Sequence, residues 1–308
     1  MGSVALRNIR KSYGAVEVLH GIDLDPRAVQ IAAAALWGTT GTVQALLPEG
    51  KQPLVVAALR LSFGAAALIF LAALRPESRR AFRALPPAVV IFAGLAIGLY
   101  NLLFFWAVLE TGVGVGTAIA IGSAPLWVTA YEIGIKRQLP DRLRVFGQAI
   151  SICGAALLVL SGADAGASGF GIALAAMSGA AYAAYSLATS RISQRAPSAT
   201  VAAATFPVAA VAVLPVFLIV PLGWLAAPGI WPAMLFLGIC ATGVSYAPGP
   251  GGLGRVAAST AVTLALIEPL TAWALATVVV GEVLTPAKLA GAVLLIAGLA
   301  IVTVFPKR

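Results

Sequence analysis

The chain is poor in charged residues, cysteine and histidine. Only 10% of its 308 residues are Asp, Glu, Lys or Arg, whereas a soluble domain averages about 25%. The two cysteines, Cys153 and Cys240, lie inside apolar runs, and we interpret them as packing residues rather than as metal ligands or a disulfide. The single histidine, His20, lies in a polar N-terminal stretch. These shortages argue against a soluble globular protein and against a metal centre.

The sequence motifs of common enzyme and nucleotide sites are also missing. There is no Gly-x-Ser-x-Gly elbow and no acidic metal-binding cluster. There is also no Gly-x-x-x-x-Gly-Lys-Ser/Thr loop, which would cradle the phosphates of a nucleotide. We therefore expect neither an enzyme nor an ATP-binding protein, and no cofactor.

Long apolar runs take the place of these motifs. Hydrophobic residues make up 60% of the chain, and the mean hydropathy is +0.98. A helix of about 20 apolar residues spans the hydrocarbon core of a bilayer. We predict an all-α membrane protein in the lipid bilayer, with ten transmembrane helices at 28–47, 54–74, 86–107, 113–133, 144–162, 169–189, 200–221, 230–247, 258–280 and 286–305.

The net charge of +9 comes from basic residues in alternate loops. Four loops and the C-terminus carry them: Arg75, Arg79, Arg80, Arg83, Lys136, Arg137, Arg142, Arg144, Arg191, Arg195, Arg255, Lys307 and Arg308. The opposite loops contain only Lys51 and Lys288. The positive-inside rule then places these basic loops and both termini on the cytoplasmic side of the membrane. We expect this membrane to be a bacterial inner membrane. We do not interpret the charge as a nucleic-acid surface.

The two halves of the chain are related by an internal repeat. Three Pro or Gly pairs coincide at an offset of 144 positions: Pro125 with Pro269, Gly147 with Gly291, and Gly154 with Gly298. We predict one five-helix repeat at 28–162 and a second at 163–308. Five is odd, so the second repeat is inverted in the membrane. The loop at 281–286 indeed lacks the basic residues of its counterpart between the fourth and fifth spans. Inverted repeats predict a transporter with a central cavity between them.

Residues 1–27 form a separate polar segment with a β-like alternation of apolar residues. Residues 1–26 resemble the opening strands of an ABC-transporter ATPase, in which an aromatic residue placed like Tyr13 stacks on adenine. The phosphate-binding loop that follows in that family is absent here, so we expect no ATP binding. This segment leaves open a membrane component of an ABC system or a non-functional fusion product.

From about residue 28 the chain resembles the drug/metabolite transporter superfamily, in its EamA-type ten-helix form. The residues that carry the resemblance are Leu36-Trp37-Gly38, Leu59-Arg60, Ala124-Pro125-Leu126, Glu268-Pro269-Leu270 and Gly281-Glu282-Val283-Leu284-Thr285, with Gly291 and Gly298 in the last span. The resemblance implies alternating access and transport of small metabolites, amino acids or drugs, usually outward. The Pro- and Gly-rich stretch at 247–254 departs from the family pattern and predicts an early end of the eighth helix.

Glu268 is the first candidate for the site, because it lies midway along a predicted span. A carboxyl at that depth is costly and normally faces a cavity or a partner. One interpretation is a proton carrier that couples transport to protons. The other is a neutral Glu268 that hydrogen-bonds a neighbouring helix, where Pro269 frees the carbonyl of Ala265.

Further candidates are polar, charged or aromatic residues inside the spans. Arg60 binds an anionic substrate group, pairs with a carboxylate or snorkels to the lipid headgroups, and the sequence leaves these alternatives open. Trp37, Asn101, Tyr182 and Ser123 either line a substrate pocket or, for the aromatic residues, belong to the interfacial belts. Pro125 and Pro269 occupy equivalent places in the two repeats and are predicted hinges. We expect a secondary transporter for a small-molecule substrate, either a monomer or a homodimer.

Overall fold

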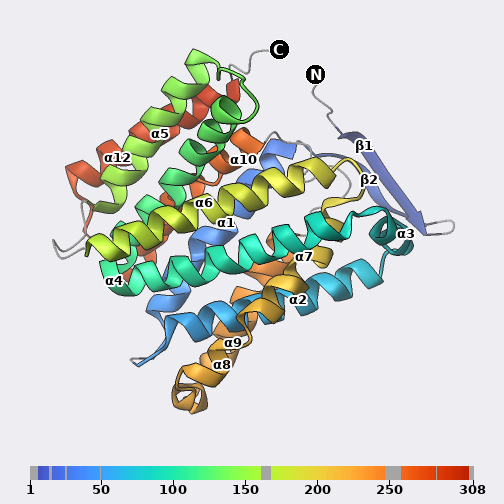
Figure 1. The fold of residues 1–308 in the computed structure, drawn as a ribbon, viewed down its shortest axis with the longest axis horizontal. Helices are drawn as coiled ribbons and strands as arrows, with labels where there is room; N and C mark the ends of the chain where they lie inside the picture. The colour runs from blue at the N-terminus through green and yellow to red at the C-terminus, as the bar shows by residue number, and fades with distance from the viewer. Residues whose placement is uncertain are drawn as a thin grey trace.

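The structure is a computed structural model that describes residues 6–13, 16–24, 26–48, 50–160, 168–246, 258–281 and 283–304. It begins with an antiparallel hairpin of β1 (Leu6–Tyr13) and β2 (Val16–Leu24), in which Leu6 pairs with Leu24 and Tyr13 with Val16. The β-strands that the apolar alternation of the N-terminal segment predicts are thus present. The hairpin lies at one end of the helical bundle that makes up the rest of the fold (Figure 1).

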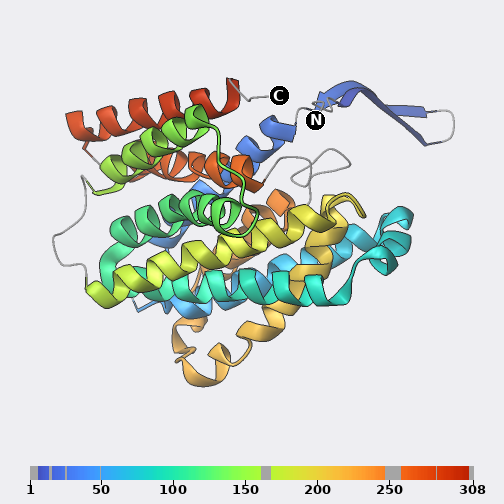
Figure 2. The ribbon, with the colours of Figure 1, turned by 45° about the horizontal axis from the view of Figure 1, so that its top comes forward.

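The first repeat contains the helices α1 (Pro26–Ala45), α2 (Pro53–Ala73), α3 (Pro76–Ala84), α4 (Pro87–Gly134) and α5 (Arg142–Leu160). Four of them begin at a proline. Proline has no backbone N–H, and an N–H in the first helical turn has no acceptor within the helix, so no hydrogen bond is lost there. The short α3 lies in the basic loop between the second and third spans and was not predicted. Figure 2 shows α3, the hairpin and the C-terminal end of α6 (Gly169–Ile192) at the same end of the bundle.

The long α4 contains two predicted spans and reverses direction between them. A Cβ placed on Gly116 would lie 3.3 Å from the Cα atom of Val108. Eight residues of straight helix would separate these positions by about 12 Å. The chain therefore turns back near Thr111, and α4 supplies two antiparallel arms, as the two predicted spans require.

The second repeat is less regular than the first. After α6 it contains α7 (Ser198–Val213), α8 (Val216–Ile219), the 3-10 turn η1 (Gly223–Ala226), α9 (Ile230–Leu235), the π-helix η2 (Phe236–Val244), α10 (Ala258–Leu264), α11 (Ile267–Leu275), the π-helix η4 (Ala276–Val280) and α12 (Pro286–Val304). The predicted break at 247–254 lies outside the described residues.

Within the described residues, each of the ten predicted spans coincides with a helical segment. Five segments are long and apolar enough to cross a membrane by themselves: Pro53–Ala73, Pro87–Thr111, Gly169–Ile192, Ser198–Ile219 and Thr260–Val279. Two shorter apolar helices are Ile230–Val244 and Pro286–Val302. The fold is a multi-pass bundle of ten transmembrane helices in two inverted five-helix repeats.

The pair α5 and α12 shows the inverted relation directly. Both views place the two helices side by side (Figures 1 and 2). A Cβ on Gly147 would lie 3.0 Å from the carbonyl oxygen of Gly298, and one on Gly154 would lie 2.7 Å from that of Gly291. In the 144-residue repeat Gly147 is equivalent to Gly291 and Gly154 to Gly298. Each glycine of α5 therefore contacts the equivalent of the other one. Reciprocal contacts of this kind are what a two-fold axis produces.

The contact of α1 with α11 is repeated by that of α6 with the second arm of α4. A Cβ on Gly38 would lie 2.6 Å from the carbonyl oxygen of Glu268, and one on Gly179 would lie 2.6 Å from that of Ala120. Small residues at these crossings let the backbones approach closely. The repeats thus bring α1, α6, α11 and the second arm of α4 together in the middle of the bundle.

Candidate functional site

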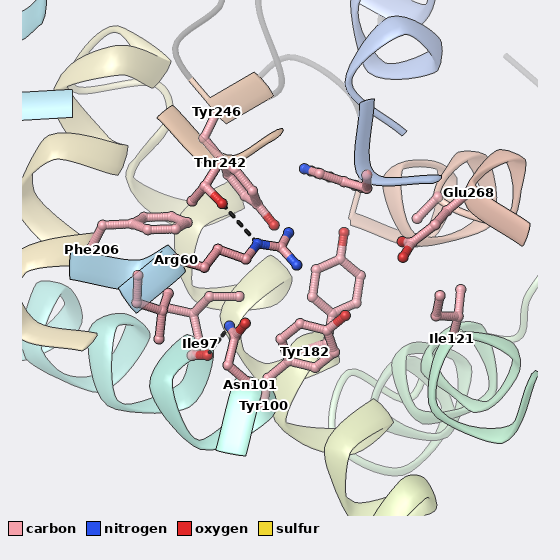
Figure 3. Close-up of a pocket in the computed structure, with 13 residues that line it drawn as sticks. Arg60, Ile97, Tyr100, Asn101, Ile121, Tyr182, Phe206, Thr242, Tyr246 and Glu268 are labelled. Carbon is pink, nitrogen blue, oxygen red and sulfur yellow. Dashed lines mark hydrogen bonds between the residues drawn. The ribbon is translucent and has the colours of Figure 1, made fainter. Parts of the chain in front are cut away.

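A cavity lies between the two repeats. Its walls come from α1, α2, both arms of α4, α6, α7, η2, α11 and the segment that joins α10 to α11. The lining residues are Trp37, Arg60, Leu61, Ile97, Tyr100, Asn101, Ile121, Tyr182, Phe206, Thr242, Tyr246, Ala265 and Glu268 (Figure 3). The predicted central cavity is therefore present, and most of the predicted site residues line it.

Arg60 reaches this cavity from α2 and does not snorkel to the headgroups. Its Nε atom donates a hydrogen bond to Thr242 Oγ1, 2.8 Å away in η2. Gly64, one turn later, makes the contact possible: a Cβ there would lie 2.5 Å from Thr242 Cγ2. The bond holds the plane of the guanidinium group, and its terminal nitrogens point into the cavity (Figure 3).

Glu268 lies on the opposite wall, in the first turn of α11. The helix is interrupted at residues 265 and 266, and the carbonyl of Ala265 accepts a hydrogen bond from the backbone N–H of Glu268 at 2.9 Å. The carbonyl that Pro269 frees is therefore satisfied by the backbone and does not need the carboxyl group. Among the described residues the Glu268 carboxylate accepts no hydrogen bond, and it faces the cavity (Figure 3).

Aromatic rings line the cavity between these two charges. The rings of Tyr100 and Tyr182 lie 5.2 Å apart, and those of Trp37 and Tyr246 lie 4.9 Å apart. Trp37 Nε1 donates a hydrogen bond to Ser245 Oγ at 2.9 Å, which ties α1 to the end of η2. Figure 3 shows tyrosine rings between Arg60 and Glu268. Trp37 and Tyr182 therefore belong to the cavity wall rather than to an interfacial belt.

Two predicted residues differ in their placement. Asn101 is buried in α4 and lines the cavity, and its Nδ2 atom donates to the carbonyl of Ile97 at 2.9 Å. Ser123 is not among the lining residues. Its hydroxyl donates to Ala120 of its own helix, and it faces Gly179 of α6. The sequence gives the depth of Ser123 in the membrane but not the direction in which it points.

The two prolines predicted as hinges also differ. Pro269 follows the interruption between α10 and α11, next to Glu268. Pro125 lies inside α4, which continues past it. The backbone is therefore broken at only one of the two equivalent positions, and a hinge role remains a prediction for both.

Sequence reasoning missed the polar partner of Arg60. Thr242 accepts from Arg60 and donates to the carbonyl of Leu237 at 2.9 Å, five residues earlier, as π-helical geometry allows. Short π-helical segments are rare and often mark functional sites. The sequence signal for Thr242 was its position as a polar residue inside an apolar span.

A second cavity adjoins the first and extends toward the end of the bundle where α6 connects to α7. Trp37, Tyr182 and Tyr246 line both cavities and separate them. The remaining walls of the second cavity are rich in hydroxyl and amide groups: Gln30, Ser186, Thr189, Ser190, Ser193 and Ser198. We call this space the hydroxyl-lined vestibule.

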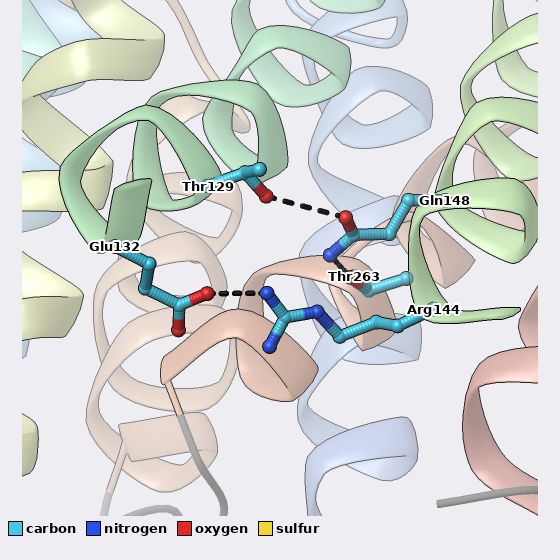
Figure 4. A network of polar contacts seen from close by, with 5 residues as sticks. All are labelled: Thr129, Glu132, Arg144, Gln148 and Thr263. Atoms are coloured by element: carbon cyan, nitrogen blue, oxygen red, sulfur yellow. Dashed lines mark hydrogen bonds and ion pairs between the residues drawn. The ribbon is translucent and has the colours of Figure 1, made fainter. Parts of the chain in front are cut away.

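A separate polar network joins the two repeats near the loop between α4 and α5 (Figure 4). Arg144 pairs with Glu132 across this loop, and Gln148 Nε2 donates to Thr263 Oγ1 of α10 at 3.0 Å. Thr129 Oγ1 donates to Gln148 Oε1 at 3.4 Å. The network connects α4 and α5 of the first repeat with α10 of the second.

We expect Glu132→Gln and Arg144→Gln each to destabilise the protein by roughly 1 kcal/mol, because a charge-assisted hydrogen bond between groups that are only 16% and 23% exposed is lost. Thermal unfolding of the single and double variants in detergent measures this, and the double variant should lose less than the sum. Arg142→Gln removes a charge at an exposed position two residues earlier and is the control. Equal stability of all the variants would contradict the pairing.

Comparison with known proteins agrees with this architecture. The EamA-like transporter family model matches the chain twice, at residues 28–160 and 169–304. An uncharacterized transporter of Bacillus subtilis, YwfM, is 34% identical over 278 residues, which is 90% of this chain and 93% of that protein. A probable amino-acid metabolite efflux pump of Salmonella typhimurium is 28% identical over 87% of this chain and 91% of that protein.

A protein of known crystal structure has the same fold. It superposes with a TM-score of 0.72 at 21% identity, over 90% of this chain and 96% of that chain. The family matches lie within residues 28–304, so they include both repeats and the cavity between them. The resemblance that the sequence predicted is confirmed, and the chain belongs to the EamA-like transporter family.

Proposed function

We propose that this protein is a secondary transporter that exports or exchanges small metabolites, amino acids or drugs by alternating access across the bacterial inner membrane. The observation that carries the proposal is one guanidinium and one carboxyl group facing the same cavity between two inverted repeats. A binding site at the interface of inverted repeats, near the middle of the bilayer, is typical of secondary transporters. The similarity to a probable amino-acid metabolite efflux pump of Salmonella typhimurium supports the substrate range.

The hydroxyl-lined vestibule supports an access route from the cytoplasmic side. It extends to the ends of α6 and α7, where Thr200 Oγ1 donates to Ser78 Oγ of the basic α3 at 3.1 Å. Basic loops lie on the cytoplasmic side by the positive-inside rule. On this proposal both termini are cytoplasmic, and the aromatic residues Trp37, Tyr182 and Tyr246 separate the vestibule from the central cavity.

Glu268 is the group that we propose to exchange a proton for the substrate. The Glu268 carboxyl group has no hydrogen-bond donor among the described residues, so it is available to bind either a proton or the substrate. Release of the substrate into the periplasm and protonation of Glu268 would then return the empty carrier. The driving force on this proposal is the inward proton gradient.

The experiment that tests the function combines binding and transport. Purified protein is screened for thermal stabilisation by amino acids, nucleosides and cationic drugs, and each hit is tested for counterflow in proteoliposomes. We expect at least one class to stabilise the protein and to exchange across the membrane. A monodisperse sample that no compound stabilises and that shows no counterflow would contradict the proposal.

The proposed orientation predicts which side reaches Ser190, which lines the vestibule on α6. In a background with Cys153 and Cys240 replaced by alanine, Ser190→Cys should react with a membrane-impermeant thiol reagent in inside-out vesicles and not in right-side-out ones. Both native cysteines are replaced so that Ser190→Cys is the only thiol. Cys153 is exposed on the outside of α5, so the packing role predicted for it is wrong.

The matched control for this labelling is Ser168→Cys, at the other end of the same helix, where Ser168 caps α6. It should show the opposite sidedness. If Ser190→Cys reacts only from the periplasmic side, the orientation is reversed and the vestibule opens outward.

A further inference from the structure

We propose that Arg60, held in place by Thr242, binds the carboxylate of the substrate while Glu268 binds its cationic group. The site would then select small molecules that carry both charges, as α-amino acids do. This inference rests on the proposed transport function and adds Arg60 as the residue that binds the anionic group of the substrate. Thr242 is assigned as a positioning residue that acts through Arg60.

The geometry of Arg60 suits a carboxylate. The Nε atom is occupied by Thr242 Oγ1, and the terminal nitrogens are directed into the cavity (Figure 3). Guanidinium groups bind carboxylates through two parallel N–H···O bonds, which require a fixed guanidinium plane. Thr242 supplies that fixation, because its own hydroxyl is oriented by donation to the carbonyl of Leu237.

Glu268 provides the opposite charge at the other side of the cavity. Its position in the first turn of α11 lets the helix dipole stabilise an ionised carboxylate. Among the described residues that line this cavity, Arg60 and Glu268 are the only charged ones. The remaining lining residues are mostly aromatic and apolar, with the amide of Asn101 and the hydroxyl of Thr242 among them.

This balance of charges explains why a singly charged ligand is disfavoured. A ligand that lacks the carboxylate displaces water from Arg60 without replacing its hydrogen bonds, and a ligand that lacks the ammonium group does the same to Glu268. Leaving a desolvated charge unpaired is expensive. Sites built to hydrogen-bond one substrate group reject analogues that lack it far more strongly than apolar pockets reject a missing methylene.

The test uses the twenty amino acids, their decarboxylated amines and their deaminated acids, with L-leucine, 3-methylbutylamine and 4-methylpentanoate as the first matched set. Inhibition of counterflow in proteoliposomes gives an affinity for each compound. In the unaltered protein we expect the amino acid of a set to bind roughly tenfold or more tightly than either analogue, the size of one charge-assisted hydrogen bond. Arg60→Gln should remove the preference for the amino acid over the amine but keep the preference over the acid.

Thr242 variants separate positioning from folding. Thr242→Val keeps the shape of the side chain but removes the hydroxyl, and it should lower the preference for L-leucine over its two analogues severalfold. Thr242→Ser keeps the hydroxyl and should retain this preference. A purely structural role of Thr242 would change the amount of folded protein without changing this ratio.

The outcomes distinguish the inference from the function on which it rests. Counterflow with amines or acids that bind as well as the amino acids would overturn the charge assignment and leave the transporter function standing. Preference ratios unchanged in Arg60→Gln would overturn it as well. Absence of any counterflow would remove both the function and the inference.

Discussion

Replacing Glu268 with glutamine is expected to abolish transport driven by a pH gradient while leaving exchange of substrate for substrate measurable. Glutamine keeps the size of the side chain but cannot release or take up a proton. The carboxylate faces the cavity and accepts no hydrogen bond among the described residues, so no local hydrogen bond should be lost. Proteoliposomes with an imposed pH gradient measure accumulation, and the same vesicles without a gradient measure exchange.

The expected pattern for Glu268→Gln is a loss of roughly 100-fold or more in gradient-driven accumulation, since the only proposed proton carrier is removed, with exchange weakened by about tenfold through the lost charge. Glu110→Gln is the control, because Glu110 is an exposed carboxyl near the turn of α4. Accumulation that persists in Glu268→Gln would show that another group or another ion couples transport, and it would return Glu268 to a binding or structural role.

For Arg60 and Glu268 the sequence predicted a position facing a cavity as one of a few alternatives, because the bilayer makes charge expensive. An ionisable side chain in the middle of an apolar span has few tolerable environments. The number of spans and the inverted relation of the halves were also predictable, since they depend on hydropathy, on an odd helix count and on loop charge. These signals depend on position along the chain alone.

The direction of each side chain was not predictable in the same way. A helix that is apolar all round has little amphipathic signal, so Ser123 could not be distinguished from a residue that faces the cavity. Hydroxyl residues are common in these spans, and many bond to their own helix, as Thr111 does to Ala107. It takes the structure to show that Thr242 meets Arg60, at the close approach of Gly64 to Thr242.

The repeat was also an incomplete guide to backbone detail. Pro125 and Pro269 align at the same offset, yet α4 continues through the first and the chain breaks before the second. Proline removes one hydrogen bond in both places. The interrupted segment carries Glu268 where its counterpart carries Ala124, although both segments contribute to the cavity wall. The repeats share their topology but not this detail of the backbone.

The antiparallel contact of α5 with α12 gives the second large expected effect. Gly154→Ala should destabilise the protein by about 3 kcal/mol and lower its apparent melting temperature by roughly 5 °C or more. The added Cβ would lie 2.3 Å from the backbone nitrogen of Leu295 and 2.7 Å from the carbonyl oxygen of Gly291. These are backbone atoms of a helix, so relief requires α12 itself to move. Thermal unfolding in detergent, followed by size-exclusion chromatography, measures the loss.

Two further variants make this prediction specific to the inverted repeat. Gly298→Ala, the counterpart of Gly154 in the second repeat, should destabilise to a similar extent, since its Cβ would lie 2.5 Å from the carbonyl oxygen of Gly147. Gly122→Ala meets only Ile152 Cγ2 at 3.6 Å. It should leave stability unchanged or raise it by up to about 1 kcal/mol, because alanine favours helix over glycine. If all three variants behaved alike, the close packing would be absent, and with it the reciprocal contact that identifies the two-fold relation of the repeats.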